Sequence, residues 1–247
     1  MAFDLISFDL DGTLVDTAGE IAEAANRALE SHGIARRSPA EITELIGAGT
    51  QELMLKLLAR SMLEQPGLVQ AVDPDAVLRS LDGHYQATTG TSATLYPGCL
   101  GTLVDLKRAG LKLACVTNKE LRHALRVLQV TGLESCFDLV IGGDSLPEKK
   151  PHASVLRFAA STLQVAIERV AHVGDSATDV AAARNAGVAA WAVPYGYNAG
   201  VSIAEARPDL IFQTLPDVAA HVFARRGPAA PTATSARLRP PDPRIIR

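Results

Sequence analysis

The chain has 247 residues, of which 47% are apolar, and its 24 Lys and Arg side chains nearly balance 27 Asp and Glu side chains. The net charge of −3 provides no attraction for nucleic acid or an anionic membrane, and no apolar stretch approaches the roughly 18 to 20 residues of a membrane helix. Three scattered cysteines and an acidic N-terminus unlike a signal peptide also argue against a secreted protein, so we expect a cytoplasmic globular protein.

A short apolar run over residues 3–8 predicts a buried strand near the start of the chain. Asp9 and Asp11 follow this run directly and precede Gly12 and Thr13. Side chains two residues apart point to the same side of an extended chain, and a glycine permits the sharp turn that comes next. Two carboxylates this close raise each other's pKa unless a cation lies between them, so the segment predicts a functional site rather than a simple turn or helix cap.

Residues 16–92 contain several helix signals and no comparable strand candidate. Capping-box patterns begin at Thr17 and Ser38, and apolar residues repeat at helical spacing after each of them. A further helix start follows Asp73. The pattern predicts an all-helical insertion over the carboxyl ends of the strands, where open α/β sheets bind ligands.

Beyond residue 93, apolar runs alternate with helical patterns. The runs lie at 111–116, 137–142, 169–174, 188–193 and 209–212. This alternation predicts an α/β domain, formed by residues 1–15 and 93–224, in which helices flank a parallel sheet.

The composition changes again near Arg225. Residues 225–247 contain six arginines and a single acidic residue, Asp242, among many alanines and prolines. Such a segment buries too little apolar surface to fold by itself, so we predict a disordered basic tail.

A second acidic segment follows the run at 169–174. Asp175 stands at the predicted strand tip, and Ser176 and Asp179 come soon after it. Ser176 and Asp179 have the spacing of a capping box, so a structural role for Asp179 is as well supported as a functional one. Asp175 is the better candidate for a metal ligand because it lies at the strand end.

Polar residues follow two further runs. Thr117 and Asn118 come after the run at 111–116 and precede a predicted helix, which they would cap or whose free N–H groups would favour a phosphate. Lys149 and Lys150 precede another helix and are the only cations that we expect near the other three strand ends.

These four segments together predict phosphoryl transfer. They place carboxylates, a hydroxyl, an amide and a lysine at one edge of the sheet, and a set of oxygen ligands suits Mg²⁺. Mg²⁺ and a lysine would neutralise a phosphoryl group, which Asp9 would attack while Asp11 protonates the leaving oxygen. We therefore expect Mg²⁺ as the cofactor and a small-molecule phosphate ester as the partner.

The same four segments, in this order, resemble the haloacid dehalogenase (HAD) superfamily over roughly residues 3 to 224. The matching motifs are DLDGT at 9–13, VTNK at 116–119, KKP at 149–151 and GDSATD at 174–179. The resemblance implies a Rossmann-like HAD fold in which residues 16–92 form a mobile helical cap. Closure of such a cap excludes water from the site during transfer.

The resemblance also implies roles for the individual side chains. Asp9 is expected to be the nucleophile, Asp11 the general acid and base, and Lys150 the cation that neutralises the phosphoryl group. Four residues are expected to bind the phosphoryl group: Gly12, Thr13, Thr117 and Asn118. The expected magnesium ligands are Asp9, the backbone carbonyl of Asp11, and Asp175. Asp179 and Ser176 are expected to support these ligands.

Within the superfamily, the motifs are most similar to those of the phosphoglycolate phosphatase group. Asp11, which dehalogenating members lack, indicates phosphate chemistry, and Thr13 replaces the valine of many mutases. The similarity implies hydrolysis of 2-phosphoglycolate to glycolate and phosphate through an aspartyl-phosphate on Asp9. One alternative is a HAD phosphatase for a sugar phosphate or a nucleotide, and another is a non-catalytic module that accepts a phosphoryl group. The group usually has proline where this chain has Ala153, and monomer and homodimer both stay open.

Overall fold

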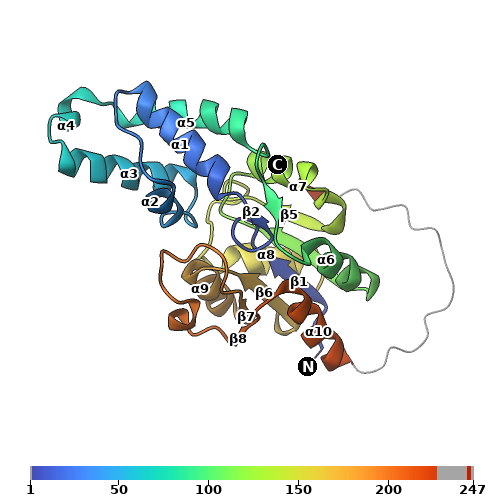
Figure 1. Cartoon of the computed structure of the whole chain (residues 1–247). Coiled ribbons are helices and arrows are strands. Elements are labelled where there is room, and N and C mark those ends of the chain that lie inside the picture. The colour runs from blue at the N-terminus through green and yellow to red at the C-terminus, as the bar shows by residue number, and fades with distance from the viewer. Residues whose placement is uncertain (1, 227–243, 246–247) are drawn as a thin grey trace.

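The computed structural model describes residues 2–226 and 244–245. This part of the chain consists of a parallel β-sheet with helices on both faces and a group of helices that projects away from it (Figure 1). Among the described residues, no helix has both the length and the apolar character that crossing a membrane requires.

The described residues include a sheet of seven strands whose pairings are all parallel. In chain order the strands are β1 (Leu5–Phe8), β4 (Lys112–Val116), β5 (Leu139–Ile141), β6 (Val170–Gly174), β7 (Ala189–Ala192), β8 (Leu210–Ile211) and β9 (Arg244–Ile245). In space their order is β8-β7-β6-β1-β4-β5-β9. Each apolar run of the sequence contains one of the first six strands, so the predicted parallel α/β sheet is confirmed.

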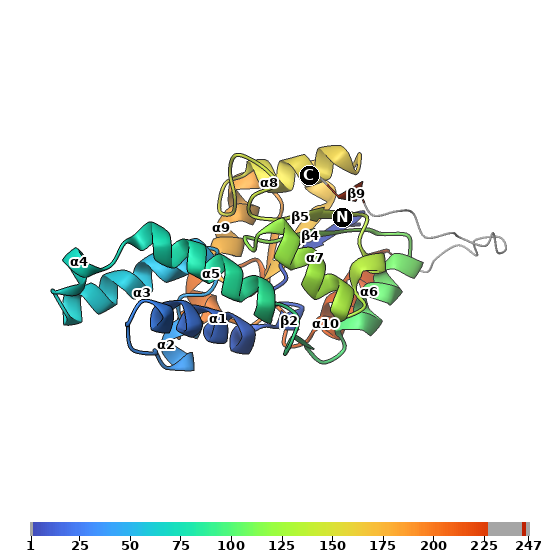
Figure 2. The ribbon, with the colours of Figure 1, turned by 90° about the horizontal axis from the view of Figure 1, so that it is seen from above.

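Helices bury both faces of this sheet, as Figure 2 shows from above. One face packs against α6 (Cys99–Arg108), α7 (Leu121–Val130) and α10 (Leu215–Arg226), and the other packs against α8 (Ser154–Thr162) and α9 (Ala177–Ala186). Short 3₁₀ helices lie in the connections: η1 (Glu134–Cys136), η2 (Ile167–Arg169) and η3 (Ile203–Ala206).

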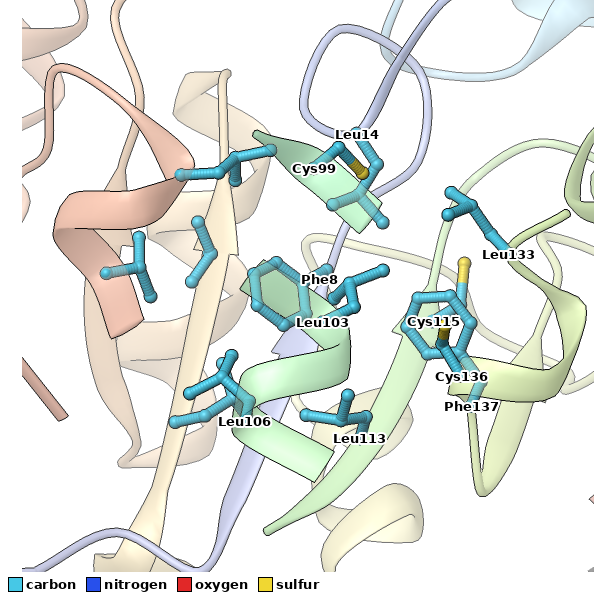
Figure 3. Close-up of a cluster of buried hydrophobic side chains, with 14 of the residues drawn as sticks. Phe8, Leu14, Cys99, Leu103, Leu106, Leu113, Cys115, Leu133, Cys136 and Phe137 are labelled. Atoms are coloured by element: carbon cyan, nitrogen blue, oxygen red, sulfur yellow. The ribbon is translucent and has the colours of Figure 1, made fainter. Parts of the chain in front are cut away.

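The cores on the two faces follow from the alternation of side chains along each strand. In β4, Leu113 and Cys115 belong to the core under α6 and α7, whereas Ala114 and Val116 belong to the core under α8 and α9. Figure 3 shows the first of these cores, which also contains Phe8. Because both faces are covered, the strands are nearly continuous apolar runs without regular polar alternation.

The projecting group consists of helices between residues 18 and 88. They are α1 (Ala18–Ser31), α2 (Pro39–Thr43), α3 (Thr50–Glu64), α4 (Leu68–Ala71) and α5 (Pro74–Thr88). These helices enclose a hydrophobic core of their own, which includes Leu29, Leu57 and Tyr85. A two-stranded antiparallel ribbon, formed by β2 (Val15–Asp16) and β3 (Thr94–Leu95), stands at their junction with the sheet domain.

Strands of two residues are too short to give a periodic pattern, and we did not predict the ribbon. It begins and ends close to the boundaries that the sequence predicts. We therefore propose that residues 1–15 and 93–224 form the α/β domain and that residues 16–92 form a separate helical domain, with the ribbon as their connection.

Of the two capping boxes predicted in the helical domain, one is confirmed. Ser38 caps α2, and its side chain and that of Glu41 bond to each other's backbone N–H groups. The box predicted at Thr17 is wrong. The Thr17 hydroxyl donates to Asp11 instead, and the Glu20 carboxylate accepts from the Gly90 N–H.

The prediction of disorder for residues 225–247 is wrong for four of them. Arg225 and Arg226 complete α10, and Arg244–Ile245 forms β9, which pairs with β5. Without β9, β5 would be an edge strand with unpaired N–H and C=O groups, and any extended segment can pair with such groups whatever its side chains. Residues 227–243 and 246–247 of the predicted tail lie outside the described residues.

Candidate active site

The neighbouring strands β1 and β6 lead the chain in opposite directions across the sheet. From β1 the chain continues toward β4 and β5, and from β6 it continues toward β7 and β8. Their outgoing loops therefore separate at the carboxyl ends and leave a crevice, which is where open α/β sheets bind ligands. Asp9 directly follows β1 and Asp175 directly follows β6, so their carboxylates flank this crevice.

A pocket lies at this point, between the strand ends and the helical domain. The sheet domain contributes Asp9, Asp11, Thr117, Asn118, Lys119, Asp175, Ser176 and Tyr197. The helical domain contributes Ile21, Ile46, Gly47, Gly49, Thr50 and Leu53. Six of the predicted site residues thus line one pocket. The other four, Gly12, Thr13, Lys150 and Asp179, are buried or contact the lining residues directly.

Three buried carboxylates come together beside the pocket. Asp9, Asp175 and Asp179 each place an oxygen within 4.8 Å of the others, and their exposed fractions are 8%, 3% and 1%. Burial raises the pKa of Asp9 to about 6, despite the opposing effect of Lys150. Burial, reinforced by the other two carboxylates, raises the pKa of Asp175 well above its ordinary value. Burial is the largest cause of both shifts, so the ionised forms of these two carboxylates are poorly solvated.

Asp175 is fixed by hydrogen bonds from two other loops. The Thr13 hydroxyl donates to its Oδ1 at 2.9 Å, and the Tyr197 N–H donates to its Oδ2 at 2.5 Å. Gly12 has a φ of +80°, and a Cβ there would overlap the Asp175 carboxylate. Thr13 is fully buried and its hydroxyl orients Asp175, whereas contact of Thr13 with a phosphoryl group stays a prediction.

Asp179 has protein partners on both of its oxygens. Its Oδ2 accepts from the N–H and the hydroxyl of Ser176, which gives the predicted capping contact. Its Oδ1 accepts from Lys150 Nζ at 2.7 Å and lies 3.1 Å from His172 Nε2. Burial would raise the pKa of Asp179, but Lys150 and His172 hold it well below the ordinary value. Asp179 therefore holds Lys150 and the Ser176 turn in place.

Lys150 bridges two of these carboxylates. Its Nζ lies 2.8 Å from Asp9 Oδ1 and 2.7 Å from Asp179 Oδ1, and its side chain is 2% exposed. Burial alone would lower the pKa of Lys150, but the two carboxylates hold it above the ordinary value. Lys149, the other lysine of the motif, donates instead to the Ala48 carbonyl of the helical domain.

Asp11 has a different cation. Lys119 Nζ lies 3.0 Å from both Asp11 oxygens, and the Thr17 hydroxyl donates to Oδ1 at 2.7 Å. The expectation that Lys149 and Lys150 supply the only cations near these strand ends is therefore wrong. Lys119 belongs to the VTNK motif, directly after Asn118, and that position was the signal that could have identified it.

Thr117 and Asn118 lie in a loop and do not cap a helix, because α7 begins only at Leu121. The Thr117 hydroxyl oxygen accepts from the Lys119 N–H at 3.3 Å, which leaves its O–H able to donate to a ligand in the pocket. The Asn118 amide donates to the carbonyls of Gly47 and Lys150. Asn118 therefore ties the loop of the helical domain to the lysine loop at the rim of the pocket.

The donor set fits a divalent cation. Asp9, Asp11, Asp175 and Asp179 face two lysines, Lys119 and Lys150, so a fully ionised set leaves two negative charges uncompensated. These carboxylates are mostly buried and offer only oxygen ligands, as Mg²⁺ or another hard cation prefers.

Known proteins resemble this chain in both sequence and fold. A family model described as haloacid dehalogenase-like hydrolase matches residues 6–193. The chain is 38% identical over 207 residues to the phosphoglycolate phosphatase of Vibrio cholerae serotype O1. This match covers 84% of this chain and 91% of that protein. It is 40% identical over 192 residues to a Cupriavidus necator protein named "Phosphoglycolate phosphatase, plasmid", covering 78% and 81%.

A solved structure has the same fold. The crystal structure of a predicted phosphoglycolate phosphatase from Haemophilus somnus matches with a TM-score of 0.82 and 32% sequence identity. The match covers 90% of this chain and 98% of that one, so it includes the helical domain as well as the sheet.

Replacement of Lys150 by Met tests the bridge between the carboxylates. Breaking a buried ion pair from one side costs about 3–5 kcal/mol, and we expect K150M to lose free energy of unfolding of that order near neutral pH without metal. The loss should be smaller near pH 5. Burial raises the folded-state pKa of Asp9 above its unfolded value in the wild type, and removal of Lys150 would raise this pKa further, so the stability that protonated Asp9 contributes is lost as pH rises through it.

Urea unfolding in the presence of a chelator measures this loss, and K149M is the matched control. Lys149 contacts a backbone carbonyl and no carboxylate in this cluster, so its loss should cost less than about 1 kcal/mol. Equal destabilisation by the two substitutions would contradict the bridging role of Lys150.

Proposed function

The chain belongs to the haloacid dehalogenase-like hydrolase family and is a phosphoric monoester hydrolase, and on this premise we propose that it converts 2-phosphoglycolate to glycolate and phosphate with Mg²⁺. The observation that carries the proposal is the buried carboxylate of Asp9, which faces the pocket at the β1 end beside Asp175 and Lys150. The names of the relatives support the choice of substrate.

In the first step, a carboxylate oxygen of Asp9 bonds to phosphorus as the bond between phosphorus and the ester oxygen breaks. The electron pair of the broken bond stays on the ester oxygen. The carboxylic acid of Asp11, which also lines the pocket, gives that oxygen its proton, and the alcohol leaves. Lys150, which contacts Asp9, and Thr117, which lines the pocket, would offset and orient the charge of the phosphoryl group.

In the second step, water attacks the phosphorus of the aspartyl-phosphate, and the bond between phosphorus and the Asp9 oxygen breaks. Asp11 is a carboxylate at this stage and takes one proton from the attacking water. Orthophosphate leaves, Asp9 is a carboxylate again and Asp11 is again protonated, so the cycle balances.

The residues that would hold Mg²⁺ are Asp9, Asp175 and the backbone carbonyl of Asp11, with Asp179 and Ser176 as their support. When bound, the ion supplies the positive charge that the carboxylate cluster lacks and polarises the phosphoryl oxygens. Asp175 suits this role because Thr13 and the Tyr197 N–H fix its orientation.

The part of the pocket lining that the helical domain contributes suits a small substrate. Ile21, Ile46 and Leu53 line the pocket with apolar surface, and the Gly47–Gly49 loop brings backbone close to the site. The loop is held there by Asn118 and Lys149, and the Thr50 hydroxyl donates to Glu120 at 2.7 Å. We infer that this helical domain acts as a cap that excludes water and limits the size of the ester.

Replacement of Asp9 by Asn tests the nucleophile. The amide is a poor nucleophile, so kcat for 2-phosphoglycolate should fall by a factor on the order of 10⁴ or more. Phosphate release from purified protein measures this, and D105N, at an exposed aspartate of α6, is the matched control with unchanged activity. Turnover retained in D9N would refute the assignment.

A panel of esters tests the substrate. We expect the highest kcat/KM for 2-phosphoglycolate, with sugar phosphates and nucleotides well below it. A flat profile would contradict the substrate proposal while leaving a phosphatase in place. Absence of phosphate release from every ester, an aryl phosphate included, would instead indicate a module that accepts a phosphoryl group without turnover.

The stabilisation of the protein by Mg²⁺ should increase with pH. Protons and Mg²⁺ compete for Asp9 and Asp175, whose pKa values are raised, that of Asp9 to about 6. Without metal, the stability that these protonated groups contribute is lost as pH rises through their folded-state pKa values. Mg²⁺ should therefore raise Tm more at about pH 7.5 than at about pH 5, by calorimetry against EDTA. An equal effect at both pH values would contradict the carboxylate site.

A further inference from the structure

Lys119 is a buried cation to which the mechanism above gives no role. Its side chain is 1% exposed, and its Nζ lies 3.0 Å from each oxygen of Asp11. Two equal contacts fix the plane of the Asp11 carboxylate as well as its position. Burial alone would lower the pKa of Lys119, but Asp11 and Tyr85 hold it above the ordinary value, so Lys119 stays charged.

The remaining contact of Lys119 comes from the other domain. Tyr85 lies on α5 of the helical domain, and its hydroxyl accepts a hydrogen bond from Lys119 Nζ. The Lys119 Nζ also lies 4.9 Å from the centre of the Tyr85 ring, within the range of a cation–π contact. The ring also contacts His123 of α7, at 4.3 Å between ring centres. Tyr85 thus contacts two residues of the sheet domain while it belongs to the core of the helical domain.

The contacts of Lys119 use its whole hydrogen-bonding capacity. An ammonium group has three N–H donors, and Lys119 has three acceptors, the two Asp11 oxygens and the Tyr85 hydroxyl. No donor is left for a substrate carboxylate. The arrangement therefore favours a role toward Asp11 over a role in binding the substrate.

We propose that Lys119 is a positioning residue that sets the orientation of Asp11, and that Tyr85 holds Lys119 in place only while the helical domain packs on the sheet domain. The inference rests on the proposed function, since it takes Asp11 as the general acid. Asp11 would then be aligned with the ester oxygen only while the helical domain packs on the sheet domain. Hydrolysis and the packing of the helical domain are then linked by one side chain.

The chemistry of the leaving group gives this role a specific signature. An alkoxide leaving from an alkyl phosphate needs the proton of Asp11, whereas nitrophenolate is stable without it. A displaced Asp11 should therefore slow the transfer from alkyl phosphates much more than the transfer from p-nitrophenyl phosphate. General distortion of the pocket would slow both.

The test compares kcat/KM for three esters in wild type, K119M, D11N and the double variant. The esters are 2-phosphoglycolate, ethyl phosphate, which has no carboxylate, and p-nitrophenyl phosphate. A positioned general acid contributes about 10²–10⁴-fold, so K119M should lose roughly 10- to 100-fold on both alkyl esters and less than about threefold on the nitrophenyl ester. The double variant should be no worse than D11N, because both changes remove the same function.

Two further variants complete the design. K56M removes an exposed lysine that pairs with Glu52 on α3 and should leave all three values unchanged. Y85F keeps the ring and Lys119 but removes the hydroxyl, and it should give the same pattern as K119M at about 3- to 10-fold. Y85F also provides the test if K119M does not fold, which circular dichroism shows directly.

Three results would overturn the inference. Equal losses of kcat/KM on all three esters would show a structural role. A loss confined to 2-phosphoglycolate would show that Lys119 binds the substrate carboxylate. Additive losses in the double variant would show that Lys119 acts apart from Asp11. Failure of the proposed function looks different. If the protein is not a phosphatase, the wild type itself releases no phosphate. If only the substrate is wrong, the wild type prefers another ester, and K119M still loses more activity on ethyl phosphate than on p-nitrophenyl phosphate.

Discussion

Buried negative charge at the carboxyl ends of β1 and β6 is the constraint on which the rest of the site depends. The topology brings Asp9 and Asp175 to the same crevice, where both side chains are largely removed from water. Charges in such a place persist only with partners. Lys150 supplies part of the compensation, and burial raises the pKa of Asp9 and of Asp175, so a further cation would favour their ionised forms.

The two buried lysines, Lys150 and Lys119, contact different aspartates of the site. Lys150 faces Asp9, where the phosphoryl group would bind, and Asp179 fixes it there. Lys119 faces Asp11, where protons would move. Lys119 contacts the helical domain through Tyr85, so in the proposed mechanism the alignment of Asp11 would depend on both domains.

The sequence was sufficient for the sheet and for most of the site because both follow local rules. Apolar runs located the strands, and the carboxylates that directly follow them had to meet at one edge. The pairing of Lys119 with Asp11 spans more than a hundred residues and has no periodic signal. The contact of Thr13 with Asp175 depends on how two loops pack. β9 pairs through its backbone, so the composition of the tail could not reveal it.

Binding of a divalent cation to these carboxylates before any substrate arrives is the central expectation for this site. Isothermal titration of the substrate-free protein with Mg²⁺ measures this, in wild type and in D175N. We predict one saturable site per chain in the wild type and severely weakened binding in D175N, since Asp175 is the ligand that the other loops hold in place. No saturable binding in the wild type, or equal binding in both proteins, would contradict the account.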